Sequence, residues 1–334
     1  MKKIFCFGEL LLRHSVDSNG SWIQQHSLPV YLGGAELNVA IALAKWKLPV
    51  KYCTALPEDY LSEQLISYLT EINIDTSAVQ HMGERVGIYY LREGTDLKGD
   101  AVIYDRANSS FSNLKPGIID WNEVLSDVSW FHFSAISPAL NNNIADVCLE
   151  AVKVATEKGL TISIDLNYRQ KLWKDRDPKS LIPELLQYCD VIMGNIWSVN
   201  KLAGGPIKDL SKHDNEEYLE QSISTADFIK KNFPKTKIVA NIFRLENNGN
   251  IEYFSSVDIE GQQITSRKFN SNLISSRVGS GDCYMAGLIY GLYNQHSNQQ
   301  LVDFSTAAGF GKLFEEGDHT NQDIQAVMQR LNHE

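Results

Sequence analysis

The 334-residue sequence lacks several features that would mark whole classes of protein. Its five cysteines form no CxxC pair and no cysteine–histidine spacing of a zinc site, so we expect buried free thiols in a reducing, cytoplasmic compartment. No stretch of about 18 consecutive apolar residues occurs, which argues against a membrane-spanning helix. The apolar run after the two N-terminal lysines is interrupted by Gly8 and Glu9. That interruption favours an opening β-strand over a signal peptide.

Blocks of basic residues are also missing. The formal net charge of −10 repels a phosphate backbone, so nucleic acid is not an expected partner. This charge does not exclude ATP, because Mg²⁺ accompanies the nucleotide and local dipoles can override the global field. No internal repeat, low-complexity tract or linker rich in proline and glycine divides the chain. We therefore expect residues 1–334 to form a single domain.

Short β-type runs alternate with amphipathic helical stretches along most of the chain. Such alternation is typical of a parallel sheet with helices on both faces, and it predicts a doubly wound α/β fold. The expected strands cover residues 4–7, 51–56, 130–134, 161–166, 191–193 and 237–243, and the expected helices cover 36–46, 59–72, 143–158, 217–233 and 282–293.

One region breaks this alternation. Residues 86–92 and 101–106 alternate their side chains with a period of two, and a turn-rich stretch at 94–100 separates them. Together with residues 10–15 and 22–32, they predict a small β-sheet lid built from about 10–32 and 86–106. The lid would cover the strand ends where α/β sheets bind their ligands.

A glycine-rich segment near the C-terminus, RVGSGD at residues 277–282, precedes a helical pattern. Small residues before a helix leave its first N–H groups free and let a phosphate approach the backbone. We therefore expect Gly279, Ser280 and Gly281 to form an anion hole. Asp282 would accept a proton from an attacking hydroxyl as a general base. The alternative is a plain glycine-rich loop in which Asp282 is the N-cap of the helix.

A second pair of glycines, Gly33 and Gly34, precedes another helical stretch, with Asn38 one turn into it. Taken alone, the pair is no more than a turn. Together with the later motif, about 245 residues away, it resembles the two signatures of the ribokinase-like (PfkB) carbohydrate kinase family, GGAxxNxA and GxGD. The P-loop, dinucleotide-binding and protein-kinase signatures are absent. The resemblance implies transfer of the ATP γ-phosphate to a small carbohydrate, with ATP and Mg²⁺ bound.

Within this family the chain resembles 2-keto-3-deoxygluconate kinases, through residues 33–40, 104–106, 165–169 and 172–173. The resemblance implies that Arg106 and Arg169 contact the carboxylate of a sugar acid. Guanidinium groups suit a carboxylate because they form paired, charge-assisted hydrogen bonds. Alternatively, Arg106 is a solvated hairpin residue, and Arg169 pairs with Asp165 or Asp175.

Other residues complete the expected sugar site. Tyr89 and Tyr104 fall in the two hairpin strands and would flank the sugar, although half-exposed tyrosines are common in sheets. Asp165 and Asn167 end a predicted strand, at the edge where ligands bind. His132 is expected to be a buried, hydrogen-bonded strand residue without a catalytic role. The expected substrate-binding residues are thus Gly33, Gly34, Asn38, Tyr89, Tyr104, Arg106, Asp165, Asn167 and Arg169.

Some segments depart from the family pattern. Asn195 begins an Asn-x-x-Glu element in which Ser198 replaces the glutamate that helps organise metal and phosphates. We expect Asn195, Gly279 and Gly281 to bind the nucleotide, and we assign no residue as a metal ligand. A loop from Arg244 to residue 250 is expected where relatives carry a glycine-bearing turn, with its arginine reaching a phosphate or solvated. Residues 317–320 resemble the family's C-terminal nucleotide-side loop too faintly to assign.

Three functions remain open from the sequence. The first is a sugar-acid kinase, and the second is the same chemistry on a neutral ketose such as fructose or on a nucleoside. The third is a catalytically silent sugar-binding protein, suggested by the missing glutamate and the altered turn. Retention of Gly279, Gly281 and Asp282 argues against this third function. A homodimer formed through the lid is also expected, because exposed sheet edges often pair between subunits.

Overall fold

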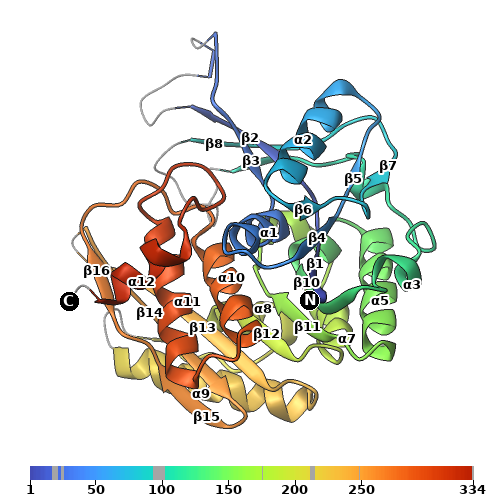
Figure 1. Ribbon diagram of the computed structural model, residues 1–334. Helices are drawn as coiled ribbons and strands as arrows, with labels where there is room; N and C mark the ends of the chain where they lie inside the picture. The colour runs from blue at the N-terminus through green and yellow to red at the C-terminus, as the bar shows by residue number, and fades with distance from the viewer. Residues whose placement is uncertain are drawn as a thin grey trace.

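The computed structural model describes residues 1–16, 22–23, 26–92, 102–174, 176–210, 215–247 and 249–332. A ten-stranded sheet forms its centre, in the order β15-β14-β13-β12-β11-β10-β1-β4-β6 with β16 beside β14 (Figure 1). Neighbours from β13 to β6 pair in parallel, whereas β14 pairs antiparallel with β13, β15 and β16. The strands are β1 Lys3–Phe7, β4 Val50–Cys53, β6 Ile74–Asp75, β10 Val128–Ser134, β11 Thr161–Asp165, β12 Val191–Gly194, β13 Ile238–Asn247, β14 Asn250–Ile259, β15 Gln262–Thr265 and β16 Phe269–Ser271.

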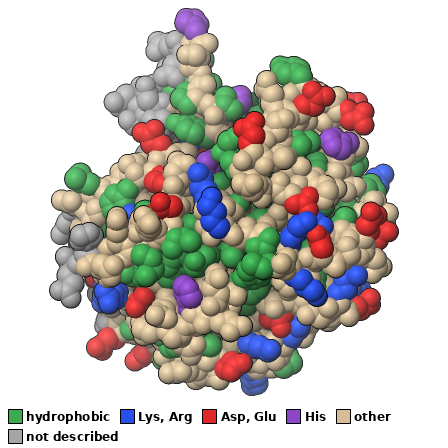
Figure 2. Space-filling view, viewed as in Figure 1, with side chains coloured by type: hydrophobic (Ala, Val, Ile, Leu, Met, Phe, Trp, Pro, Cys, Tyr) green, Lys and Arg blue, Asp and Glu red, His purple; other side chains and the backbone are tan. Residues whose placement is uncertain are grey.

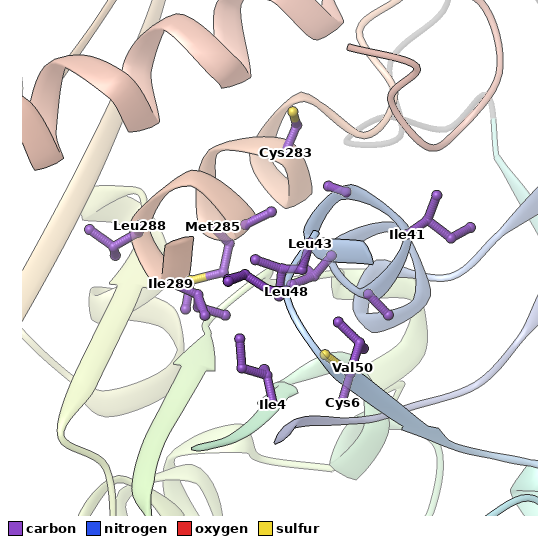
Figure 3. Packing of buried hydrophobic residues seen from close by; sticks show 14 of the residues in the cluster. Ile4, Cys6, Ile41, Leu43, Leu48, Val50, Cys283, Met285, Leu288 and Ile289 are labelled. Atoms are coloured by element: carbon purple, nitrogen blue, oxygen red, sulfur yellow. The ribbon is translucent and has the colours of Figure 1, made fainter. Parts of the chain in front are cut away.

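Helices cover both faces of this sheet, as the alternating pattern predicted. In β1, Ile4 and Cys6 point to one core and Phe5 and Phe7 to the other, because successive side chains of a strand face opposite sides. Figure 3 shows the first core, packed between the sheet and two of its helices. The helices on the side of this first core are α1 Ala35–Lys45, α2 Tyr60–Glu71, α10 Ser280–Tyr293, α11 Asn298–Lys312 and α12 Ile324–Asn332. The helices on the opposite side are α3 Trp121–Val124, α5 Asn142–Glu157, α6 Gln170–Trp173, α7 Ile182–Leu186, α8 Ile196–Ala203 and α9 Asn215–Asn232.

A separate four-stranded sheet, in the order β3-β2-β8-β9, projects beyond the end of the main sheet as the expected lid (Figure 1). The two middle strands run parallel and the outer strands antiparallel to them. The expected strand at 22–32 is wrong in its first part, because Trp22 and Ile23 lie in a turn and pairing begins only after Pro29, which has no N–H to donate. The strands are β2 Leu11–Val16, β3 Val30–Gly33, β8 Gly87–Arg92 and β9 Ile103–Asp105.

The loop expected from Arg244 onward is also wrong. Strand β13 continues to Asn247 and pairs with β14 along its whole length, from Ile238 opposite Ile259 to Asn247 opposite Asn250. The turn between the strands contains Gly249 with a φ of 80°, a left-handed conformation that favours glycine. A tight hairpin with a glycine in its turn therefore extends the strand where the sequence suggested irregular structure.

The cysteines and the distribution of surface charge are those expected from the composition. All five cysteines are free and buried, as expected. Acidic and basic side chains are interspersed over the face drawn in Figure 2. Within the described part of the chain, no helix combines the length and apolar character needed to cross a bilayer.

Candidate active site

One cavity lies where the parallel strands β11 and β12 end and the lid strands β8 and β9 face them. It gathers every expected site residue except Gly33, which ends β3 and packs against the side chain of Asp318 on the cavity wall. The lining residues among those expected are Gly34, Asn38, Tyr89, Tyr104, Arg106, Asp165, Asn167, Arg169, Asn195, Gly279, Ser280, Gly281 and Asp282.

The glycine-rich motif forms the N-terminus of α10. Gly279 is the N-cap with a φ of 75°, and Asp282 is the third helical residue, so the alternative that Asp282 caps the helix is wrong. A Cβ atom built on Gly281 meets no atom within 4 Å, which leaves the backbone there open to the cavity. The Ser280 hydroxyl turns inward and donates to Gly309 O at 2.9 Å. The motif therefore presents backbone, not the serine side chain, to a ligand.

Asp282 has the ionisation expected of a base. Burial raises its pKa to about 7; the hydrogen bond from Asn38 opposes this, Asp165 adds to it, and the cation of Arg169 opposes it. Asn38 Nδ2 donates to Asp282 Oδ2 at 2.7 Å. Among the described residues, the buried Asn38 Oδ1 has no hydrogen-bond partner. The pair thus joins a carboxyl that can exchange a proton near neutral pH to a buried acceptor that a ligand hydroxyl can satisfy.

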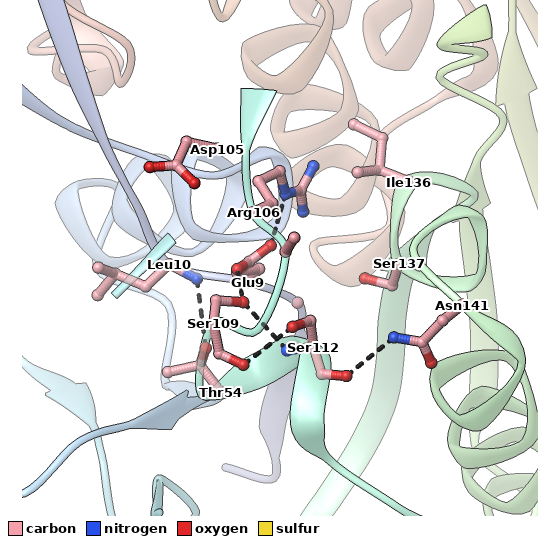
Figure 4. Close-up of polar contacts among 12 residues, drawn as sticks. Glu9, Leu10, Thr54, Asp105, Arg106, Ser109, Ser112, Ile136, Ser137 and Asn141 are labelled. Atoms are coloured by element: carbon pink, nitrogen blue, oxygen red, sulfur yellow. Dashed lines mark hydrogen bonds and ion pairs between the residues drawn. The ribbon is translucent and has the colours of Figure 1, made fainter. Parts of the chain in front are cut away.

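Arg106 follows β9 and is buried, so the solvated-hairpin alternative is wrong. Its Nε donates to Glu9 Oε2 at 2.5 Å, and Ser109 Oγ donates to the other oxygen of Glu9 (Figure 4). Arg106 also lines the cavity. Sequence reasoning missed Glu9, although a carboxylate directly after the first strand lies at the ligand-binding edge of the sheet.

Arg169 reaches the same cavity from a different element. It follows β11 and precedes α6, and its Nη1 donates to Tyr168 O at 3.2 Å. Asp165, at the end of β11, accepts the backbone N–H of Asn167 at 3.0 Å and is buried. The alternative partner Asp175 lies outside the described residues. The two arginines expected at the sugar therefore reach the cavity from different elements, Arg106 from the lid and Arg169 from a strand end.

Asp318, in the C-terminal loop, is a second residue that the sequence did not single out. Its carboxylate accepts Arg13 Nε at 2.7 Å and the Tyr89 hydroxyl, and both donors belong to lid strands. Tyr89 is buried rather than half-exposed, and its ring lies 6.5 Å from that of Tyr104. A Cβ on Gly279 would overlap Asp318 O. The loop that resembled the family only faintly thus connects the lid to the glycine motif.

The two departures from the family pattern also reach the cavity. Asn195 caps α8, and its Oδ1 accepts the backbone N–H of Ser198 at 2.8 Å and the Ser198 hydroxyl at 3.0 Å. The serine therefore folds back onto Asn195 where a glutamate would extend. Arg244 lies within β13, not in a loop, and lines the cavity. A nucleotide contact by Arg244 remains a prediction.

His132 has the structural role that was expected. It is buried in β10, and its Nδ1 lies 3.0 Å from Ser163 Oγ. Burial lowers the pKa of His132 to about 3, so the ring is neutral at physiological pH. A neutral ring held within the sheet stabilises the fold and takes no part in acid–base chemistry at the cavity.

A doubly wound sheet, a β lid and a buried aspartate beside a glycine-lined helix N-terminus together define a kinase of small molecules. Residues 1–239 match the sequence profile of the pfkB family carbohydrate kinases, and the chain belongs to that family. It is therefore an ATP-dependent sugar kinase. The glycine motif at 279–282 lies beyond the matched residues and completes the site.

Several proteins are similar to this chain in sequence or fold. A 2-dehydro-3-deoxygluconokinase structure from Thermotoga maritima superposes with a TM-score of 0.90 and 31% identity, covering 100% of both chains. A 2-dehydro-3-deoxygalactonokinase from Haloferax volcanii is 29% identical over 57% of this chain and 60% of its own length. A 5-dehydro-2-deoxygluconokinase from Geobacillus thermodenitrificans is 24% identical over 83% of this chain and 77% of its own length.

Proposed function

We propose that this kinase phosphorylates a keto-deoxy sugar acid, with 2-keto-3-deoxygluconate as the favoured substrate. The observation that carries the proposal is that Arg106 and Arg169, from two separate elements, line the same cavity. A pair of guanidinium groups binds a carboxylate far better than a neutral sugar. The names of the three relatives above also describe kinases of keto-deoxy sugar acids.

In the proposed reaction, the Asp282 carboxylate accepts the proton of the attacking sugar hydroxyl. The sugar oxygen then forms a bond to the γ-phosphorus of ATP while the bond from that phosphorus to the β-phosphate oxygen breaks, releasing ADP. Backbone N–H groups at the start of α10, around Gly281, stabilise the charge on the transferred group. Asn38 holds the carboxylate of Asp282 toward the cavity.

The residues present are compatible with Mg²⁺ held chiefly by phosphates and water. Among the described residues, no group of three or more carboxylate, histidine or cysteine side chains is placed to bind a metal. Mg²⁺ commonly takes one or two carboxylates together with substrate phosphates, and Asp165 offers such an oxygen on the cavity wall. Bound there, the ion would neutralise phosphate charge. Ser198, folded onto Asn195, leaves the metal to these partners.

A neutral ketose is the second candidate, and one observation favours it. Glu9 already compensates the charge of Arg106 through a buried ion pair, so this arginine does not require an anionic ligand. If Arg106 serves only to hold the lid segment, fructose or a nucleoside fits the same chemistry. The two readings differ in what the terminal nitrogens of Arg106 bind.

The test is ADP release with Mg-ATP across sugar acids, neutral ketoses and nucleosides. For the preferred acid, Arg106→Ala and Arg169→Ala should each lower kcat/KM by about 10- to 150-fold, the loss expected when one charge-assisted hydrogen bond to the substrate is removed. Lysine at either position should rescue only part of the loss, because it lacks the two-pronged geometry. Arg85→Ala is the matched control, since Arg85 pairs with Asp105 and does not line the cavity.

The deciding quantity is the ratio of kcat/KM for acid and neutral sugars, which cancels general damage to the fold. If both alanine variants leave this ratio unchanged, the neutral-sugar candidate is the better one. If the wild-type chain releases no ADP with any sugar, the catalytically silent hypothesis replaces both. Each outcome therefore selects one function.

We also propose that the protein is a cytoplasmic homodimer joined through the lid. The outer lid strands carry exposed apolar side chains, with Val30 54% and Ile103 59% exposed, and edge strands readily pair with a second copy. The five free, buried cysteines fit a reducing compartment. Light scattering should give twice the mass of the 37.6 kDa chain, and a monomer would contradict the dimer.

A further inference from the structure

Lys312, the last residue of α11, is a buried cation that the proposed mechanism does not use. Its exposed fraction is 0%, and its Nζ donates to Glu315 O at 3.0 Å and Gly317 O at 3.1 Å. Both acceptors are backbone carbonyls rather than carboxylates. Burial lowers the pKa of Lys312, and the charges of Glu315 and Asp318 oppose this. Burying an ammonium without a paired anion is costly, so packing alone gives no reason for a lysine here.

The surroundings of Lys312 connect it to the glycine motif. A Cβ atom built on Gly279 would lie 3.4 Å from Lys312 Cε. The two carbonyl groups that bind the ammonium belong to the turn that leads into Asp318, and Asp318 O packs against the same glycine. The ammonium therefore lies directly behind the N-terminus of α10, on the protein side, while the open backbone of Gly281 faces the cavity.

We propose that the Lys312 ammonium is a tethered cation that orders the turn at 315–318 and strengthens the anion hole from behind. It is a positioning residue and does not touch the substrate. The inference rests on the proposed phosphoryl transfer, because the charge it supports is that of the transferred group.

The physical basis is twofold. Backbone carbonyls pointing at one spot repel one another, and a positive charge between them removes this repulsion and fixes the turn. A buried unit charge close to the helix N-terminus also adds to the positive potential that the first N–H groups present to a phosphate. Both effects are lost when the side chain is neutral, whatever its shape.

The experiment uses two substitutions that differ in the space they leave. Lys312→Ala leaves room beside the two carbonyls for a small cation, whereas Lys312→Met fills that room with an apolar chain of similar length. For the preferred sugar, both should lower kcat by about 10- to 100-fold with little change in the sugar KM. Ammonium chloride should restore Lys312→Ala in a saturable manner. Choline chloride at equal ionic strength should not, because choline is too large for the space.

The outcomes are separable. The tethered-cation inference is wrong if Lys312→Met retains the wild-type kcat, or if ammonium and choline act alike on Lys312→Ala. Should the alanine variant fail to fold, loss or retention of kcat in Lys312→Met decides the matter. If the wild-type chain proves inactive with every sugar, the proposed function fails. The cation site is then judged by whether ammonium, and not choline, raises the unfolding temperature of Lys312→Ala.

Discussion

Replacing Asp282 by asparagine should abolish most catalysis while making the protein more stable. The carboxyl is buried, and its pKa rises from 3.8 to about 7 on folding. Asparagine has nearly the same shape and can still accept the hydrogen bond from Asn38 through its amide oxygen. The variant loses the base, so turnover should fall by about 10²- to 10⁴-fold with sugar binding nearly unchanged.

The stability gain follows from proton linkage. Between about pH 4 and about pH 7 the unfolded chain has already lost the Asp282 proton while the folded chain retains it. The unfolded state therefore binds fewer protons, and the wild-type free energy of unfolding falls as the pH rises through this window. A pKa raised from 3.8 to about 7 corresponds to a cost of about 4 kcal/mol once the folded carboxyl is ionised. Asp282→Asn does not bear this cost.

Two measurements on the same preparations test the reasoning. Sugar-dependent ADP release should show wild-type kcat/KM rising with pH through about 7, and this rise should vanish in Asp282→Asn. Urea unfolding should show a stability advantage of the variant that grows by about 2–3 kcal/mol between about pH 5 and about pH 8. Turnover close to the wild-type rate would refute the base assignment. A stability difference independent of pH would refute the raised pKa.

Further predictions concern the two glycines and the C-terminal loop. Gly281→Val should lower turnover equally for every accepted sugar without loss of thermal stability, because its side chain enters open cavity; a loss confined to one sugar would place Gly281 in the sugar pocket. Gly279→Ala should instead lower the free energy of unfolding by about 1–3 kcal/mol, since its φ of 75° and Asp318 O leave no room for a side chain. Asp318→Ala should cost about 3–5 kcal/mol in urea unfolding by stranding buried Arg13, and a cost under about 1 kcal/mol would show that the ion pair is not holding the lid.

Much of this site could be predicted from the sequence, because its residues lie at the ends of strands and helices that the sequence pattern indicates. Asp165 and Asn167 follow a run of strand type, and Gly279 and Gly281 precede a helical run, so each could be placed at the ligand-binding edge of an α/β sheet. Glu9 occupies an equivalent position after β1, yet nothing local to the sequence shows that it pairs with Arg106, 97 residues away. Position along the chain predicts where a residue lies, but not which partner it has there.

The orientation of side chains was a second feature that the sequence could not predict. Ser280 and Asp282 belong to one short motif, but the serine hydroxyl faces Gly309 in the core whereas the aspartate carboxyl meets Asn38 at the cavity. Which face of α10 a residue occupies depends on how the helix packs against α11 and the sheet. The same packing buries Lys312 behind the motif, where a charged residue at a helix end would ordinarily be solvated.

The sequence by itself determined the doubly wound fold and the lid, because periodicity and turn residues are local properties that propagate along each element. The meeting of the two glycine motifs was implied only by the resemblance to the family. Only the tertiary structure decided the buried ion pairs, the length of β13 and the role of the C-terminal loop. Arg13 and Asp318 are 305 residues apart, and their contact exists only because the lid and the last loop fold onto the same glycine motif. A charged side chain that would be solvated in an isolated segment becomes buried and paired once distant elements enclose it. Its hydrogen bonds and ion pairs then replace the hydration that it has lost, so each of them contributes more to stability than it would in water.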